Sequence, residues 1–156
     1  MVIALILLVI MTLVGLSAMR TVTLEEKMTA QTYDRSLSFQ AAEAALREAE
    51  ALVETVVPTP VSGAACVAGV CGEPPTSAAP RWADASFAGW QDATAVANGA
   101  ISLTPQYIVE YLGNTFPCQP GTPSAGTDCK RYRITARSNA GNDRAVVMLQ
   151  SIFAAE

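Results

Sequence analysis

The first nineteen residues, Met1 to Met19, carry no charged side chain, and no glycine or proline interrupts the chain between Gly15 and Pro58. A helix of ~20 apolar residues crosses a bilayer, so this segment has the length of a membrane span. Proline and glycine are the residues that most readily end a helix, and their absence predicts that the helix continues beyond the span. A helix from Met1 to about Val56 is roughly 80 Å long at ~1.5 Å per residue. We therefore expect an apolar half-helix joined without a break to a polar one.

The apolar start also invites comparison with a secretory signal peptide, which has basic residues before the apolar run and a small-residue cleavage site after it. The chain begins Met1-Val2-Ile3 without a basic residue, and Leu16 to Met19 is a poor cleavage site. We expect that a basic leader has already been removed and that the apolar helix is the mature N-terminus.

The charge balance argues against nucleic-acid binding and against catalysis. Net charge is −4, and the longest basic cluster is the pair Lys130-Arg131. Nucleic-acid backbones are bound by Lys and Arg clustered on one face, so no nucleic-acid partner is expected. The chain has no histidine, the most frequent general base, and no Gly-rich phosphate loop. We therefore expect a protein that is not an enzyme and that has no cofactor and no metal.

Four cysteines form an even set in a chain with a membrane-entering segment, which favours an oxidising compartment and two disulfides. They are Cys66, Cys71, Cys118 and Cys129. Three pairings are possible, and the local one, 66 with 71 and 118 with 129, closes two short loops rich in small residues and proline. We favour that local pairing. A zinc site is the competing interpretation, but neither spacing is CxxC and no histidine could complete the site.

The polar half of the predicted helix carries a continuous apolar stripe. Its members recur at spacings of three and four residues, as one helical face requires; they are Phe39, Ala42, Leu46, Ala49, Val53 and Val56. We expect this stripe to pack on the protein's own sheet. Glu43 and Arg47, on another face, are placed for an i,i+4 ion pair. The segment 20–38 has few large apolar residues, so we expect it to contact neighbouring subunits.

Residues 58–104 show no clear periodicity, and their prolines and glycines predict an irregular connector. Within it Trp82 and Trp90 lie eight residues apart, with Phe87 between them. We expect these aromatic side chains to anchor the connector on the core. A ligand platform is the alternative interpretation.

Residues 105–156 have the pattern of a small antiparallel sheet. Gln106 to Leu112 is rich in aromatic and β-branched residues, as strands are. Arg131 to Arg137 alternates between apolar and polar side chains, which predicts one buried and one solvated face. A turn at 139–142 joins it to a partner strand from Arg144 to Phe153. The fold class is therefore α+β: a spine helix over 1–57, and a head over 58–156 with at least three antiparallel strands.

Two parts of the amino-acid sequence resemble those of a known protein family. Residues 4–50, ALILLVIMTLVGLSAMRTVTLEEKMTAQTYDRSLSFQAAEAALREAE, resemble the minor pilins of the PilX family, as do the closing strands YRITARS and VVMLQSIF. The resemblance implies the type IV pilin fold, in which a long N-terminal helix packs on a small antiparallel sheet with a disulfide near the C-terminus.

The match departs from type IV pilins in general at one position. Most of them carry a glutamate close to the mature N-terminus, where it answers the N-terminal amine of a neighbouring subunit, whereas Leu5 here belongs to an unbroken apolar series. A carboxylate in hydrocarbon is costly unless it is paired, so its absence makes insertion of the helix into the membrane easier. Its absence also removes a contact that would set the position of the helix relative to its neighbour. Recognition in a fibre core must then come from shape, and we expect Leu5, Gly15, Ser17 and Ala18 to form that assembly surface.

The resemblance implies a structural subunit of a type IV pilus, a minor pilin that primes or modulates assembly and supports adhesion or twitching motility. Expected partners are other pilins, major and minor, through the N-terminal helix, and the inner membrane before assembly. The expected location is the bacterial inner membrane, with the head in the periplasm, and then the extracellular pilus. Two alternatives stay open: the major pilin of its own filament, and a single-span membrane receptor whose head binds a ligand.

Overall fold

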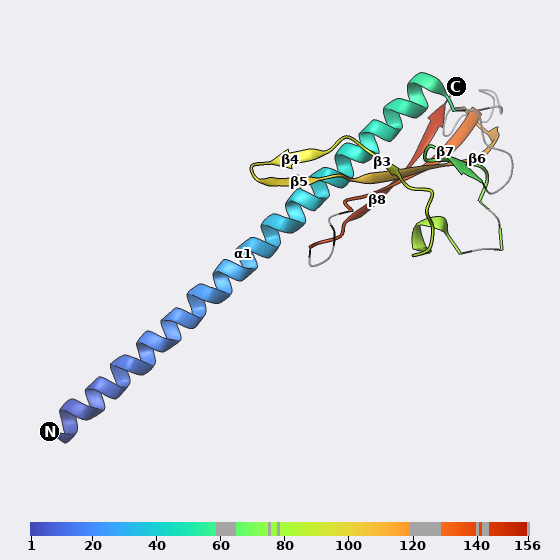
Figure 1. Cartoon of the computed structure of the whole chain (residues 1–156). Helices are drawn as coiled ribbons and strands as arrows, with labels where there is room; N and C mark the ends of the chain where they lie inside the picture. The colour runs from blue at the N-terminus through green and yellow to red at the C-terminus, as the bar shows by residue number, and fades with distance from the viewer. Residues whose placement is uncertain are drawn as a thin grey trace.

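The chain is an extended helix with a β-rich head folded around its C-terminal half (Figure 1). This computed structural model describes residues 1–58, 65–74, 76–77, 79–118, 129–139, 141 and 144–155, and all side chains among them except that of Ala18. The N-terminal half of the helix projects away from the head, as Figure 1 shows in blue. This arrangement is the α+β architecture that the sequence predicts.

Helix α1 runs from Val2 to Val56 without a break, as the absence of glycine and proline predicts. Its 55 residues correspond to ~80 Å at ~1.5 Å per residue. The helix ends at Val57, which adopts the left-handed conformation with φ 44° and donates its N–H to the carbonyl of Val53 at 3.0 Å. Pro58 follows and has no N–H with which to extend the helical ladder.

The buried face of α1 is made mainly of small residues. Its fully or almost fully buried members are Leu37, Ser38, Ala41, Ala42, Ala45, Ala49 and Val53. The predicted stripe is therefore right for its central members and wrong at its two ends: Phe39 is 47% exposed and Val56 is 65% exposed. Alanines let the helix backbone approach the sheet closely, so the buried face follows them, and Phe39 lies about a quarter turn away.

The main sheet has six strands, five of them in the order β1-β2-β6-β7-β8, with β3 also pairing with β6. The three long strands, β6, β7 and β8, form an antiparallel ladder. A separate hairpin of two strands, β4 and β5, lies beside α1 (Figure 1). The strands are β1 (Cys66–Val67), β2 (Val70–Cys71), β3 (Gln91–Asp92), β4 (Val96–Asn98), β5 (Ile101–Leu103), β6 (Gln106–Phe116), β7 (Cys129–Arg137) and β8 (Met148–Ala155).

Two features of the sheet differ from the expectation. The stretch 58–104, expected to be an irregular connector, contains β1 to β5 and a 3-10 helix at Arg81–Ala83. Strand β2 lies parallel to β6, so the sheet is mixed and not purely antiparallel. These strands are two or three residues long, which is too short for a recognisable period in the sequence.

The core lies between α1 and one face of the sheet. Tyr132, Ile134 and Ala136 alternate along β7 and are fully buried against the helix, as predicted. The other face of β7 is not fully solvated, because Thr135 is also fully buried. A second, smaller core joins Leu37 and Ala41 of α1 to the β4–β5 hairpin.

The aromatic residues of the connector behave differently from one another. Trp90 contacts Phe87 edge-on, with ring centroids 6.2 Å apart, and the guanidinium of Arg137 lies 4.1 Å from its ring centroid. A cation over an aromatic face is attractive, so Trp90 anchors the connector on β7 as expected. Trp82 is 38% exposed and does not act as a buried anchor.

Candidate functional site

The first candidate surface is the apolar stretch of α1 that no part of the head covers. Every large apolar side chain from Met1 to Met19 is at least 45% exposed. By length and composition α1 contains one stretch that is able to cross a membrane. Soluble proteins rarely leave so large an apolar surface uncovered, so this surface fits a membrane anchor.

Leu5, Gly15 and Ser17, the three predicted assembly residues that the structure describes in full, do not lie together on one side of this stretch. Leu5 is 67% exposed, and a Cβ added to Gly15 would meet nothing within 4 Å. Ser17 is exposed, while the side chain of Ala18 lies outside the described residues. Because Gly15 and Ser17 are two residues apart, they point about 200° apart around a helix of 3.6 residues per turn. Their role in assembly stays a prediction.

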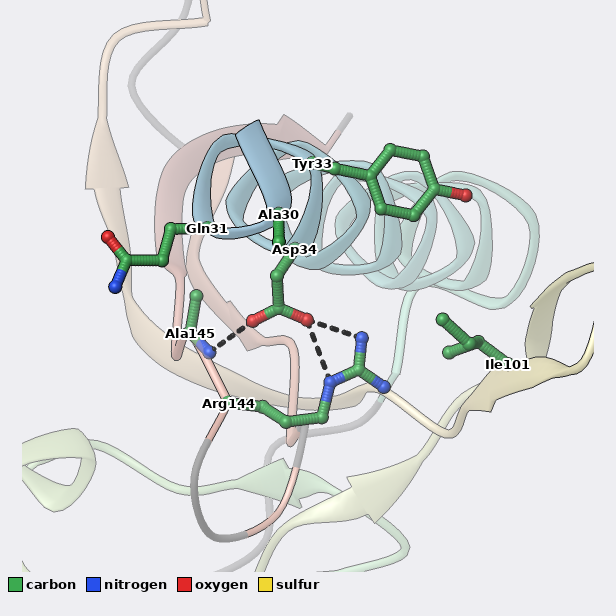
Figure 2. A pocket seen from close by; sticks show the side chains of 7 residues that line it. All are labelled: Ala30, Gln31, Tyr33, Asp34, Ile101, Arg144 and Ala145. Atoms are coloured by element: carbon green, nitrogen blue, oxygen red, sulfur yellow. Dashed lines mark hydrogen bonds and ion pairs between the residues drawn. The ribbon is translucent and has the colours of Figure 1, made fainter. Parts of the chain in front are cut away.

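The second candidate site is the junction where the free half of α1 meets the head. Asp34 lies there and points at the loop before β8 (Figure 2). Its Oδ1 accepts hydrogen bonds from Nε of Arg144 at 2.8 Å and from a terminal guanidinium nitrogen at 2.5 Å. Its Oδ2 accepts the backbone N–H of Ala145 at 2.6 Å. Each carboxylate oxygen is thereby held by the head, which fixes the direction in which the free half-helix leaves it.

The environment of Asp34 favours its ionised form. The backbone N–H of Ala145 and then the guanidinium of Arg144 hold the pKa of this carboxyl below its usual value of 3.8, against the opposing effect of partial burial. About a quarter of each side chain in the Asp34–Arg144 pair remains exposed. This contact therefore persists throughout the physiological pH range as an ion pair.

A groove of about 780 Å³ lies beside this ion pair. Figure 2 shows Tyr33 and Gln31 pointing to opposite sides of Asp34, with Ile101 of β5 on the same side as Tyr33. Apart from the Asp34–Arg144 pair, whose charges neutralise each other, none of the described residues that line this groove is charged. The arrangement suits an apolar contact better than the binding of a charged small molecule.

A buried ion network lies on the other face of the sheet. Glu110 of β6 is fully buried; its Oε1 is 2.8 Å from a guanidinium nitrogen of Arg81, and its Oε2 is 2.8 Å from both Nε and a terminal nitrogen of Arg133. The guanidinium of Arg81 also donates to the carbonyl of Gly72 at 3.0 Å. A buried carboxylate is tolerated only when its oxygens are satisfied in this way. The network therefore ties the connector to the centre of the sheet.

Sequence reasoning missed both ion contacts. Glu110 is the one charged residue within the apolar segment QYIVEYL, a signal that identifies a buried carboxylate but not its partners. Arg81 is 29 residues away along the chain, and Asp34 is 110 residues from Arg144. Their pairing follows from the topology, which the local pattern does not contain.

The four cysteines form the two disulfides favoured from the sequence, Cys66–Cys71 and Cys118–Cys129. The first links directly opposed residues of the β1–β2 hairpin. The second joins Cys118, two residues beyond the end of β6, to Cys129, the first residue of β7. Among the described residues no group of three His, Cys, Asp or Glu side chains is placed to hold a metal ion.

Two further contacts hold the upper half of α1 on the head. Glu50 accepts a hydrogen bond from the hydroxyl of Ser151 at 2.7 Å. The buried hydroxyl of Tyr132 donates to the carbonyl of Pro58 at 2.8 Å, just beyond the end of α1. The head is thus attached along α1 from Asp34 to its C-terminal end.

The expected ion pair between Glu43 and Arg47 also forms, within α1 on its exposed face.

Comparison with known families gives two matches that together cover nearly the whole chain. Residues 36–155 match the family described as type IV pilus assembly protein PilX, C-terminal part, and residues 1–47 match the PilX N-terminal family. No curated protein and no solved structure matches the chain. The division between the two matches falls in the segment where α1 enters the head.

Proposed function

Since the chain belongs to the PilX family of type IV pilus assembly proteins and is therefore a minor pilin subunit, we propose that it is held in the inner membrane before it enters the pilus. The observation that supports this role is the uncovered apolar half of α1, continuous with a folded head. A bilayer and a core of packed helices both favour the same apolar surface. The subunit can therefore move from the bilayer into the core of packed helices.

In this proposal the head lies on the periplasmic side and the subunit primes pilus assembly within a complex of minor and major pilins, with effects on adhesion or twitching motility. The family is a structural one, and the role given to this chain is structural. A receptor with a mobile head normally has a break after its span. Here α1 stays helical from the apolar stretch into the head, and Asp34 fixes its exit direction.

The experiment compares pili on cells that lack the gene, cells that carry it, and cells in which residues 1–19 are exchanged for an unrelated apolar span. We expect few pili without the gene and few with the exchanged span, although the exchanged protein still inserts in the membrane. Sheared pili are then probed for the subunit and for its copy number relative to the major pilin. Normal piliation without the gene, together with no subunit in sheared pili, contradicts the proposal.

A further inference from the structure

Strand β8 forms one border of the main sheet. It pairs with β7 along its whole length without a register shift, and no other strand that the structure describes pairs with it. In an antiparallel pair every second residue points its N–H and C=O away from the neighbouring strand. Because β8 is eight residues long, its outer edge offers such groups over ~26 Å at ~3.3 Å per residue.

This edge lacks the features that normally keep an edge strand unpaired. Edge strands are protected by charged side chains, proline, bulges or short length. The sequence of β8, MLQSIFAA, has no charged residue and no proline, and its Ile152 is 66% exposed. By contrast, β1 at the opposite border is only two residues long. The edge of β8 is therefore suited to accept a further strand.

An open groove of about 510 Å³ lies between α1 and this edge. The helix residues that line it lie within about 60° of Glu50 around α1, and Glu50 accepts a hydrogen bond from Ser151 of β8. The groove therefore lies beyond β8, where none of the described strands covers α1. Its lining residues are Thr32, Arg35, Ser36, Phe39, Val147 and Leu149.

A strand added beside β8 would present its two faces to different surroundings. Leu149 lies opposite the buried Ala136 and is therefore on the face of the sheet toward α1, whereas Ile152 lies opposite Arg133 on the other face. On the helix side, the added side chains would enter the groove beside Phe39, which is 47% exposed. On the other side they would lie beside Ile152. Apolar side chains suit both faces.

The groove carries one charge. Arg35 is exposed and forms no ion pair with any residue that the structure describes. The other described residues that line the groove are uncharged. A carboxylate on the helix side of an added strand would pair with Arg35 and neutralise the groove. Complementary charges of this kind select the partner and fix its register.

We propose that the free edge of β8 accepts an extended strand from the head of a different pilus subunit, whose apolar side chains cover Phe39 and whose carboxylate pairs with Arg35. This proposal rests on the proposed function, because it takes the partner to be another pilin. The main-chain groups of β8 give affinity for any extended strand, and the groove gives preference for one with this pattern.

A second copy of this chain does not suit the edge. Strand β8 runs in the same direction as α1, since Leu149 lines the groove with Phe39 while Ser151 bonds to Glu50 farther along the helix (Figure 1). Antiparallel pairing, the more frequent kind, would then point the apolar ends of the two α1 helices in opposite directions. Two subunits held in one membrane cannot adopt that arrangement.

The test uses the full-length chain in cells that assemble pili, with Ile152 replaced by the photo-reactive amino acid p-benzoylphenylalanine. After irradiation, the products are purified through a tag on this chain, and the cross-linked residue of the partner is mapped by mass spectrometry. We expect that residue to lie in an extended segment of another pilin that carries Asp or Glu. The same photo-reactive residue in place of Ser102, an exposed residue of β5, is the control and should not give this product.

Strand pairing has a signature that a contact between side chains lacks. Met148 and Ile152 lie four residues apart in β8, so the partner residues that face them should also lie four residues apart. We expect Met148→Cys and Ile152→Cys to form disulfides with single cysteines of the partner at that spacing. Cross-links without that spacing contradict the addition of a strand.

Charge exchange then tests Arg35 in the same cells. We expect Arg35→Glu to reduce the cross-linked product about fivefold, and exchange of the mapped carboxylate of the partner for Arg to restore it. Arg20→Glu makes the same change of charge on an exposed residue outside the groove, and should leave the product unchanged.

Three results overturn the proposal: no cross-link from position 152, a cross-link only to a second copy of this chain, or a product that is insensitive to Arg35→Glu. The pili of the same cells are probed for the subunit. A subunit that is present in pili without the cross-link overturns this contact alone, whereas absence of the wild-type subunit from pili overturns the proposed function.

Discussion

The buried carboxylate of Glu110 gives the sharpest prediction about the stability of the head. Replacing Glu110 with Gln keeps the shape of the side chain and removes the negative charge that the guanidinium groups of Arg81 and Arg133 contact. Removing one partner of a buried ion network costs about 3–5 kcal/mol of unfolding free energy, because a charge stays buried without compensation. The lower end of this range applies, since Arg133 retains 23% of its side-chain exposure.

A loss of about 3 kcal/mol lowers the melting temperature of a domain of this size by about 10 °C, taking ~3–4 °C per kcal/mol. The assay is thermal unfolding of the full-length protein in detergent, followed by circular dichroism at a β-sheet wavelength so that the free half of α1 contributes little. Glu43→Gln is the matched control. It breaks the pair with Arg47, whose side chain is 73% exposed, and exposed pairs of this kind contribute about 0.3–0.5 kcal/mol.

The expected result is a large loss for Glu110→Gln and a change of about 1–2 °C for Glu43→Gln. A double variant in which Glu110 and Arg81 are both replaced by apolar residues should recover part of the loss, since a buried ion network is often no more stable than a well-packed apolar substitute. Equal melting temperatures for wild type and Glu110→Gln would refute the reasoning, because they would show that water reaches the network.

Three further predictions concern the attachment of α1 and the disulfides. Tyr132→Phe removes the hydrogen bond to Pro58 and should lower the unfolding free energy by about 1 kcal/mol, measured by chemical denaturation. The pKa of Asp34 is lower in the folded protein than its usual 3.8; its stabilising effect is therefore present above that pH and lost as the pH falls through the folded pKa. The stability gap between wild type and Asp34→Asn should accordingly narrow below about pH 4. Opening Cys118–Cys129 alone, by paired replacement with Ser, should cost about 3 kcal/mol for a loop of this length, while peptide mapping still finds the other disulfide.

Sequence periodicity was sufficient for the long elements. The helix followed from the missing glycine and proline, and the alternation of Tyr132, Ile134 and Ala136 gave the buried face of β7 correctly. The observed strand boundaries differ from the predicted ones by a few residues: β6 continues beyond Leu112 to Phe116, and β8 begins at Met148 and not at Arg144. The residues before Met148 are used instead for the contact with Asp34.

The remaining features depend on contacts between distant segments. Phe39 fits the apolar period of α1 yet lies beside β8 without being covered, because the sheet approaches the helix over its alanines. Strand β2 is only two residues long and exists because it finds a parallel place beside β6. Arg81 could not be assigned to Glu110 from a pattern, since nothing local connects a 3-10 helix with the middle of a strand.

The direction of α1 relative to the head is fixed at Asp34, where the free part of the helix meets the head. Residues 1–19 of α1 offer uncovered apolar surface, whereas the helix from Asp34 onward is fixed to the head. An exposed segment with charged side chains lies between these two parts. A change of about 10° in the direction of α1 at Asp34 would move Met19 by about 4 Å, because ~22 Å of helix separate the two residues. The Asp34 contact therefore sets where the apolar half-helix stands relative to the head. In the proposed role, a fixed direction presents the same apolar surface first to the bilayer and then to the neighbouring pilin helices.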